Sequence, residues 1–233
     1  MAGRILLALT LMLIFQVAVT QVTQADKTLI ASVHDKYRSS VQSSNMMKMR
    51  YHDGIAAKAQ IHANKCHFQH DSSADRALPE LPGVYVGQNL AYSTGGKNWQ
   101  YIINLWASEM QNFKMGVGST NGSAVGHYTQ LMLWKTQAVG CGYKECPRFK
   151  LYVCNYAYGQ YTWDIKYPWK VGSKCADCPN NCNNGFCDCK MQFCNSKTDI
   201  KDAKCNCTPW WLLKWWEQKG ISTWTTDIES ALA

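Results

Sequence analysis

The sequence predicts an α+β domain followed by a small disulfide-rich module, and three observations support this. Apolar residues recur at helical spacing through the first half of the chain. Short runs rich in β-branched and aromatic residues follow in the second half. The twelve cysteines are unevenly spread, with four between Cys66 and Cys154 and eight between Cys175 and Cys207. Helices in the first half of a domain and strands in the second favour an architecture in which the helices cover one sheet. Closely spaced cysteines are typical of a module too small to build its own apolar core.

Residues 1–25 are predicted to be a secretory signal peptide. Arg4 precedes an apolar run of ~15 residues, which is short for a membrane span. Small residues before two candidate sites permit cleavage between residues 20 and 25. No later segment of the sequence is apolar and long enough to span a bilayer, so we expect a secreted, extracellular protein without a transmembrane span.

Three helices are predicted in the main domain, residues 26–170. Residues 26–41 begin at a candidate N-cap, Asp26, and place apolar residues at helical spacing. Residues 54–66 are alanine-rich. Residues 98–113 carry the strongest apolar stripe, with Asn98 as the predicted cap: Trp99, Ile102, Ile103, Trp106, Met110 and Phe113.

Glu109 lies just beside this stripe at ~100° per residue, on the edge nearest Ile102. A carboxylate there could reach inward, although the sequence alone favours an ordinary solvated position. Three strands are predicted further on, from the runs "HYTQLMLW", "AVGCGY" and "LYVCNYAY".

Charge separates the same two parts of the chain. Residues 26–170 hold 16 Lys/Arg and 9 Asp/Glu, whereas residues 171–233 hold 7 of each. A modestly basic main domain would favour anionic surfaces such as lipid head groups or acidic glycans, but a merely soluble basic surface is the simpler interpretation. The sequence contains no Lys/Arg-rich run or nucleic-acid motif, so no nucleic-acid partner is expected.

Five ordered motifs resemble those of the CAP superfamily, which includes cysteine-rich secretory proteins, venom allergens and pathogenesis-related proteins. They are "MRYHDGIAAKAQIHANKCHFQH", "VGQNLAYS", "LWASEMQNF", "GHYTQLMLWKTQAVGCGY" and "YVCNYAYGQY", and the agreement as a whole covers roughly residues 28 to 160. The second is similar to the family's "GENL" turn. The resemblance implies a three-layer αβα sandwich, and the layout is that of a cysteine-rich secretory protein with a shortened C-terminal module.

The same resemblance implies a cleft that holds four polar residues: His70, Gln88, Glu109 and His127. The family usually has a glutamate where this chain has Gln88, so one negative charge is lost. His70 and His127 are the expected ligands of a zinc or similar divalent ion, bound weakly because of Gln88. A purely structural hydrogen-bonded network is an equally good interpretation, and no cofactor is expected to be required.

A divalent-metal-dependent hydrolase built on His70, Glu109 and His127 is a minor alternative. The sequence has no H-E-x-x-H pair, no G-x-S-x-G elbow and no evident nucleophile beside a histidine. We therefore assign no catalytic residue and do not expect an enzyme.

The resemblance to the family also implies which cysteines are paired. In the main domain it implies Cys66–Cys146 and Cys141–Cys154. In residues 171–209 the spacing C-x₂-C-x₃-C-x₄-C resembles the hinge of cysteine-rich secretory proteins, which implies Cys175–Cys182 and Cys178–Cys187. Four cysteines remain, and the sequence does not choose among their three connectivities: Cys189, Cys194, Cys205 and Cys207.

Residues 210–233 form a Trp-rich tail with five of the ten tryptophans. The tail could contact a membrane surface, but a segment that covers the small module is slightly preferred. Two sequons are candidate glycosylation sites, with Asn121 in a Gly- and Ser-rich loop preferred over Asn206, which lies between two cysteines.

The family resemblance implies a secreted binding or modulating protein in defence, reproduction or venom. Its partner would be a lipid, a sterol or an extracellular protein. A toxin directed at ion channels is the first alternative. The match to the hinge supports it, and the absence of two cysteines of the module that usually follows weakens it. The metal-dependent hydrolase is the second.

Overall fold

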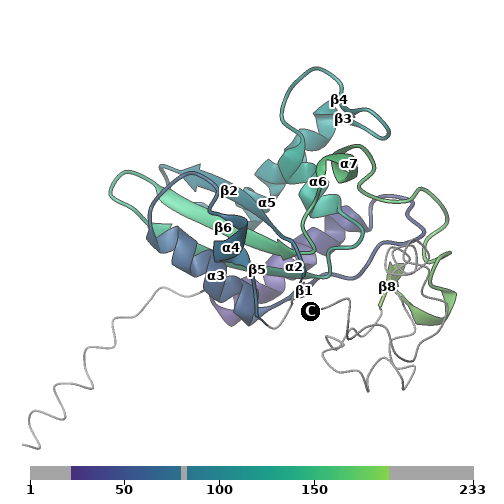
Figure 1. Cartoon of the computed structure of the whole chain (residues 1–233), viewed down its shortest axis with the longest axis horizontal. Helices are drawn as coiled ribbons and strands as arrows, with labels where there is room; N and C mark the ends of the chain where they lie inside the picture. The colour runs from purple at the N-terminus through teal and green to yellow at the C-terminus, as the bar shows by residue number, and fades with distance from the viewer. Residues whose placement is uncertain (1–21, 80–82, 189–233) are drawn as a thin grey trace, which may run out of the picture.

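A computed structural model describes residues 22–79 and 83–188. Its centre is a four-stranded sheet in the order β1-β5-β6-β2 (Figure 1). The short strand β1 runs parallel to β5, and the other neighbours are antiparallel. The strands are β1 (Arg50–Tyr51), β2 (Val86–Ser93), β5 (Ala138–Glu145) and β6 (Lys150–Ala157).

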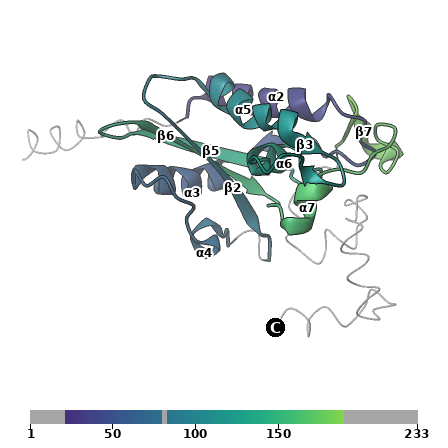
Figure 2. The same ribbon diagram turned by 90° about the horizontal axis from the view of Figure 1, so that it is seen from above.

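Helices cover both faces of this sheet. Figure 2 shows α2 (Gln24–Arg38) and α5 (Trp99–Ala107) on one side and α3 (Asp53–Asn64) and α4 (Ser73–Arg76) on the other. The largest apolar cluster lies between the sheet and the α2/α5 layer, and a smaller one lies under α3. This is the αβα sandwich that the resemblance implies, and the prediction of the fold is confirmed.

The remaining elements are short. They are η1 (Ser108–Asn112), β3 (Phe113–Lys114), β4 (Gly118–Ser119), α6 (Gly126–Met132), α7 (Thr162–Lys166), η2 (Pro179–Asn181), β7 (Cys182–Asn183) and β8 (Phe186–Cys187). Among the helices of residues 22–79 and 83–188, none is long and apolar enough to cross a membrane.

Several predictions lie outside the described residues. These are most of the signal peptide, the last four cysteines (Cys189, Cys194, Cys205 and Cys207), the sequon at Asn206 and the Trp-rich tail.

The start of α2 differs from the prediction. Its N-cap is Thr23, whose hydroxyl accepts a hydrogen bond from the backbone N–H of Asp26 at 3.1 Å, and the Asp26 carboxylate accepts one from the Thr23 N–H at 3.1 Å. Asp26 therefore occupies the third helical position of a capping box rather than the cap itself. The helix begins three residues earlier than its apolar periodicity indicates.

Helix α5 is capped by Asn98 as predicted, because the Asn98 side chain accepts from the N–H of Tyr101 at 2.9 Å. The α-helix ends at Ala107, however, and continues as the 3₁₀ turn η1. A 3₁₀ turn has three residues per turn, so the 3.6-residue stripe no longer follows one face. Met110, expected in the core, is 51% exposed for this reason.

Two local predictions are wrong. The run "HYTQLMLW" was expected as a strand and forms helix α6, and the "GENL"-like segment forms strand β2 instead of a turn. Both elements are buried on nearly all sides, so neither shows a clear periodicity in its apolar residues. The other two strand predictions are confirmed as β5 and β6, which pair Cys141 with Cys154 in register.

Glycines bring α3 directly onto the sheet. A Cβ atom on Gly140 would lie 2.2 Å from the backbone nitrogen of Ala56, and one on Gly142 would lie 2.6 Å from the Cα of Gln60. Any larger residue in strand β5 would push the helix away from the sheet.

The buried guanidinium of Arg38, at the end of α2, joins distant parts of the chain. It donates hydrogen bonds to the backbone carbonyls of Met47, Leu131, Leu133, Trp134 and Thr136 at 2.7 to 3.3 Å. Burial lowers the pKa of Arg38 to about 10, and the nearby Asp35 opposes this shift.

Four disulfides are present in the described residues, and they are the pairs that the resemblance implies: Cys66–Cys146, Cys141–Cys154, Cys175–Cys182 and Cys178–Cys187. The last two lie in the hinge, residues 171–188. The hinge packs against the main domain, because Phe186 joins the large apolar cluster and the N–H of Cys187 donates to the carbonyl of Met46 at 2.8 Å.

Candidate functional site

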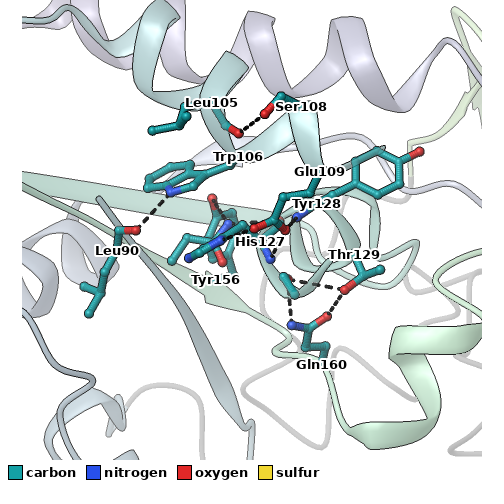
Figure 3. A network of polar contacts seen from close by, with 12 residues as sticks. Leu90, Leu105, Trp106, Ser108, Glu109, His127, Tyr128, Thr129, Tyr156 and Gln160 are labelled. Carbon is teal, nitrogen blue, oxygen red and sulfur yellow. Dashed lines mark hydrogen bonds and ion pairs between the residues drawn. The ribbon is translucent and has the colours of Figure 1, made fainter. Parts of the chain in front are cut away.

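Glu109 and His127 form a close pair beside Trp106 (Figure 3). The Nδ1 of His127 lies 2.6 Å from the Oε1 of Glu109. A carboxylate can only accept here, so Nδ1 carries a proton and donates it to this hydrogen bond. The imidazole stacks on the Trp106 ring with centroids 6.2 Å apart, and Trp106 is itself fixed by its N–H donating to the carbonyl of Leu90.

The second oxygen of Glu109 caps helix α6. Oε2 accepts the backbone N–H groups of His127 at 2.9 Å and Tyr128 at 3.1 Å. The residue before the helix, Val125, makes no side-chain cap bond, so Glu109 takes over that role from a distant element. Glu109 therefore reaches inward, which the sequence alone had not favoured, and its side chain is only 15% exposed.

The electrostatics of Glu109 follow from these contacts. Partial burial by itself would raise the pKa of Glu109. The hydrogen bond and charge of His127, together with the two backbone N–H groups, outweigh burial and hold this pKa below its usual value.

His70 and Gln88 form the second pair. His70 Nδ1 donates to Gln88 Oε1 at 2.9 Å, and Gln88 Nε2 donates to Asp71 Oδ1 and Asn155 Oδ1, each at 3.0 Å. Asp71 is nearly fully buried and also accepts from the Arg76 guanidinium at 2.6 Å. The amide of Gln88 thus joins an exposed histidine to a buried ion pair.

Each pair is connected to one of two consecutive residues of strand β2, Gln88 and Asn89. Adjacent strand residues direct their side chains to opposite faces, and the contacts agree. Gln88 bonds to Asn155 on the α3 side, whereas Asn89 donates to the carbonyl of His127 at 3.1 Å on the α6 side. The four residues predicted to share one cleft form two hydrogen-bonded pairs, His70 with Gln88 and Glu109 with His127.

Sequence analysis missed several members of these networks: Asp71, Arg76, Asn89, Trp106 and Asn155. Asp71 directly follows His70, and an acidic residue there, beside the unusual Gln88, is a signal that could have been noticed. Asn89 and Asn155 are fully buried amides, and nothing in their local sequence distinguishes them from surface asparagines.

The residues fit a metal only weakly. In each histidine the Nδ1 is held by a neighbour, as is usual for metal ligands, which leaves Nε2 as the nitrogen that a metal would use. Catalytic zinc sites need three protein ligands and structural sites four. The described part of the chain has no cluster of three or more His, Cys, Asp or Glu side chains that could hold a metal ion.

The sequon asparagine Asn121 is exposed in the loop between β4 and α6. Its Nδ2 donates to Asn112 Oδ1 at 2.9 Å, and its Oδ1 accepts from the N–H of Ser123 at 3.0 Å. The acceptor nitrogen of the sequon is thus at the surface, within a local turn.

The αβα sandwich with its disulfides and hinge defines a disulfide-stabilised α+β protein carrying a cysteine-rich module. The CAP family, described as the cysteine-rich secretory protein family, matches residues 31–156. The chain is 32% identical to human (Homo sapiens) cysteine-rich secretory protein 3 over 219 residues, which cover 83% of this chain and 87% of that protein. The chain belongs to the CAP family.

Venom proteins are among its relatives. Cysteine-rich venom protein helothermine of Heloderma horridum horridum is 36% identical over 186 residues, covering 75% of this chain and 76% of the relative. Cysteine-rich venom protein Mr30 of Conus marmoreus is 37% identical over 200 residues, covering 84% of this chain but only 66% of the relative.

Solved structures share the fold. Na-ASP-1 superposes with a TM-score of 0.62 at 26% identity, covering 73% of this chain and 49% of that chain. NaASP2, solved with Zn²⁺, has a TM-score of 0.57 at 23% identity, covering 72% of this chain and 97% of that chain.

Proposed function

We propose that the protein is secreted and acts outside the cell by binding a lipid, a sterol or a protein partner. The observation that carries this proposal is that the polar residues of the candidate site are already hydrogen-bonded to other parts of the protein. Both oxygens of Glu109 are engaged by His127 and the start of α6, and Gln88 is engaged by His70, Asp71 and Asn155. These side chains serve the fold, which leaves recognition to the surface.

Export is supported by the leader-like sequence and by disulfides, which persist in oxidising compartments. The capping box of α2 favours the earlier of the two cleavage sites, because cleavage after Ala25 would remove the Thr23 cap. N-terminal sequencing of the secreted protein tests this, and a mature start at or before Thr23 is expected. A glycan on Asn121 would appear as a mass lost on enzymatic deglycosylation and absent from Asn121→Gln.

Activity that depends on a surface must survive removal of the two histidines. In any assay that the purified protein supports, such as lipid transfer, His70→Ala/His127→Ala is expected to retain activity. Loss of activity in this variant, with its fold intact by circular dichroism, would contradict the proposal and favour the metal-dependent hydrolase.

Zinc titration calorimetry on the same two proteins separates these outcomes. We expect binding weaker than micromolar, because only two nitrogen ligands are offered and Gln88 replaces a carboxylate. Micromolar binding that disappears in the double variant would establish a metal site and would revive the hydrolase.

An ion-channel-directed role is the second candidate, favoured by the two hinge disulfides and by the venom relatives. Recordings from a panel of ion channels would test it. The matched control is a chain ending at residue 188, because a cut at residue 171 would also remove Phe186 from the main core. Block by the full chain and not by this control would assign the activity to residues 189–233, and block by both would assign it to the part of the chain that includes the hinge. No block by either would remove the channel-directed role.

A further inference from the structure

Helix α7 carries an exposed aromatic surface. Trp163 is 67% exposed, more than any other large apolar side chain in the described ranges, and Tyr161 and Tyr167 are 58% and 40% exposed. Trp163 and Tyr167 lie one helical turn apart and stack with their ring centroids 4.5 Å apart. The helix therefore offers two adjacent aromatic rings to the outside.

The fold holds this surface rigidly. Asp164, on the inner side of α7, accepts from the backbone N–H of Tyr161 at 2.7 Å and from Lys135 Nζ at 2.9 Å. The β3–β4 hairpin is attached to the end of α7, because the N–H of Gly116 donates to the carbonyl of Lys166 at 2.8 Å. Figures 1 and 2 both show the hairpin beside α7.

The exposed charged side chains of α7 and of the β3–β4 hairpin are lysines. Lys166 of α7 and Lys114 of the hairpin are both exposed. Asp164 is buried and neutralised by Lys135. Glu145, the other acidic residue between residues 113 and 170, ends strand β5 next to the β5–β6 turn, at the opposite end of the sheet (Figure 2).

We propose that this α7 surface, comprising Lys114, Tyr161, Trp163, Lys166 and Tyr167, docks on the surface of a bilayer that contains anionic phospholipid. Tryptophan and tyrosine are favoured at the membrane–water boundary, where the ring is buried and its polar atom stays hydrated. Lysines beside them are attracted to anionic head groups. Exposed aromatic rings flanked by charges of the same sign suit a fluid, negatively charged surface better than a shaped protein pocket.

This inference rests on the proposed extracellular binding function and identifies an anionic bilayer as the partner. The test is flotation of the full secreted chain with vesicles of phosphatidylcholine and phosphatidylserine at a molar ratio of about 7 to 3, compared with phosphatidylcholine alone. We expect binding only to the anionic vesicles, and weaker binding as salt is raised, because salt screens charges outside the protein.

Two variants locate the contact. Trp163→Ala/Tyr167→Ala and Lys114→Ala/Lys166→Ala should each weaken vesicle binding about tenfold, since each removes two interfacial side chains. The matched control is Phe68→Ala/Tyr92→Ala, which removes another exposed aromatic pair, with ring centroids 4.8 Å apart, and should bind as the wild type does. All three pairs are exposed, and thermal unfolding verifies that the variants remain folded.

Three results would overturn the docking surface. They are equal binding to neutral vesicles, equal weakening by the control pair, and wild-type binding by both α7-surface variants, which would place the membrane contact elsewhere in the chain. Absence of vesicle binding by a chain that still binds a soluble protein partner or transfers lipid would overturn the docking surface alone and leave the proposed function standing.

Discussion

At residue scale, Glu109 links two elements that are far apart in sequence. One carboxylate orients the His127 ring with one oxygen and terminates helix α6 with the other. Removing the charge of Glu109 therefore affects both the orientation of the His127 ring and the hydrogen bonding at the start of α6. The effect should be visible in stability even where no activity is known.

Replacing Glu109 with glutamine should lower the free energy of unfolding by about 1–2 kcal/mol at neutral pH, because a neutral amide accepts more weakly than a carboxylate. The folded pKa of Glu109 lies below its unfolded value, so its stabilisation is complete above an ordinary carboxyl pKa and is lost as the pH falls through the folded value. The difference between wild type and variant should thus shrink on acidification.

Denaturant unfolding across the acidic range measures this difference. Glu145→Gln is the matched control, since its carboxylate is 77% exposed and contacts only Lys150 at 3.4 Å among the ion pairs of the described residues. A constant difference for Glu109→Gln at every pH would show that the carboxylate charge is not what matters.

The contact with Asp71 gives a physical reason for glutamine, rather than glutamate, at position 88. A glutamate at this position would place a second carboxylate 3.0 Å from Asp71 and would lose the two hydrogen bonds that Gln88 Nε2 donates. Gln88→Glu should therefore destabilise the protein by about 1–3 kcal/mol, by like-charge repulsion and unpaired acceptors.

A double-mutant cycle tests the origin of that penalty. In an Asp71→Asn background the repulsion is absent and the new amide can donate, so Gln88→Glu should cost clearly less there. The same cost in both backgrounds would mean that Asp71 and residue 88 are not coupled.

At element scale, the sequence predicts the elements that have a distinctive apolar spacing or composition and misses others that have neither. Helices α2, α3 and α5 and strands β5 and β6 follow from their patterns and caps. Helix α6 and strand β2 are enclosed by other elements, so their composition is apolar without a face, and local patterns cannot separate helix from strand. The resemblance supplied His70, Gln88, Glu109 and His127 as one set, and their pairing depends on tertiary contacts that no local pattern specifies.

The contact between α3 and the sheet gives an element-scale prediction. Gly140→Ala should destabilise the protein by more than about 3 kcal/mol or prevent secretion, because its Cβ would meet backbone atoms of α3 that cannot move alone. Secreted yield and thermal unfolding measure the effect. Gly95→Ala, whose Cβ would meet no atom within 4 Å, should be near neutral, and equal losses in the two variants would refute the packing argument.

At the scale of the whole molecule, the disulfides should contribute unequally. Cys66–Cys146 closes a loop with a sequence separation of 80, and Cys175–Cys182 closes one with a separation of 7. Because the constraint on the unfolded chain grows with loop length, removal of the first bond with paired alanines should cost about 4 kcal/mol and removal of the second about 2–3 kcal/mol.

Unfolding in denaturant, with the other bonds intact by mass, gives both values. A larger loss for the hinge bond would mean that its packing against the main core, through Phe186, outweighs chain entropy.

The buried Arg38 has a consequence for how a chain with twelve cysteines reaches one oxidised form. Its buried cation is stabilised by the carbonyl of Met47 and by those between Leu131 and Thr136, which converge on it in the native structure. A compact isomer with mispaired cysteines that buries Arg38 without those carbonyls carries an uncompensated charge and is strongly disfavoured. Burial of this one cation should therefore favour the disulfide pairing of the native structure over compact isomers in which those carbonyls are out of place.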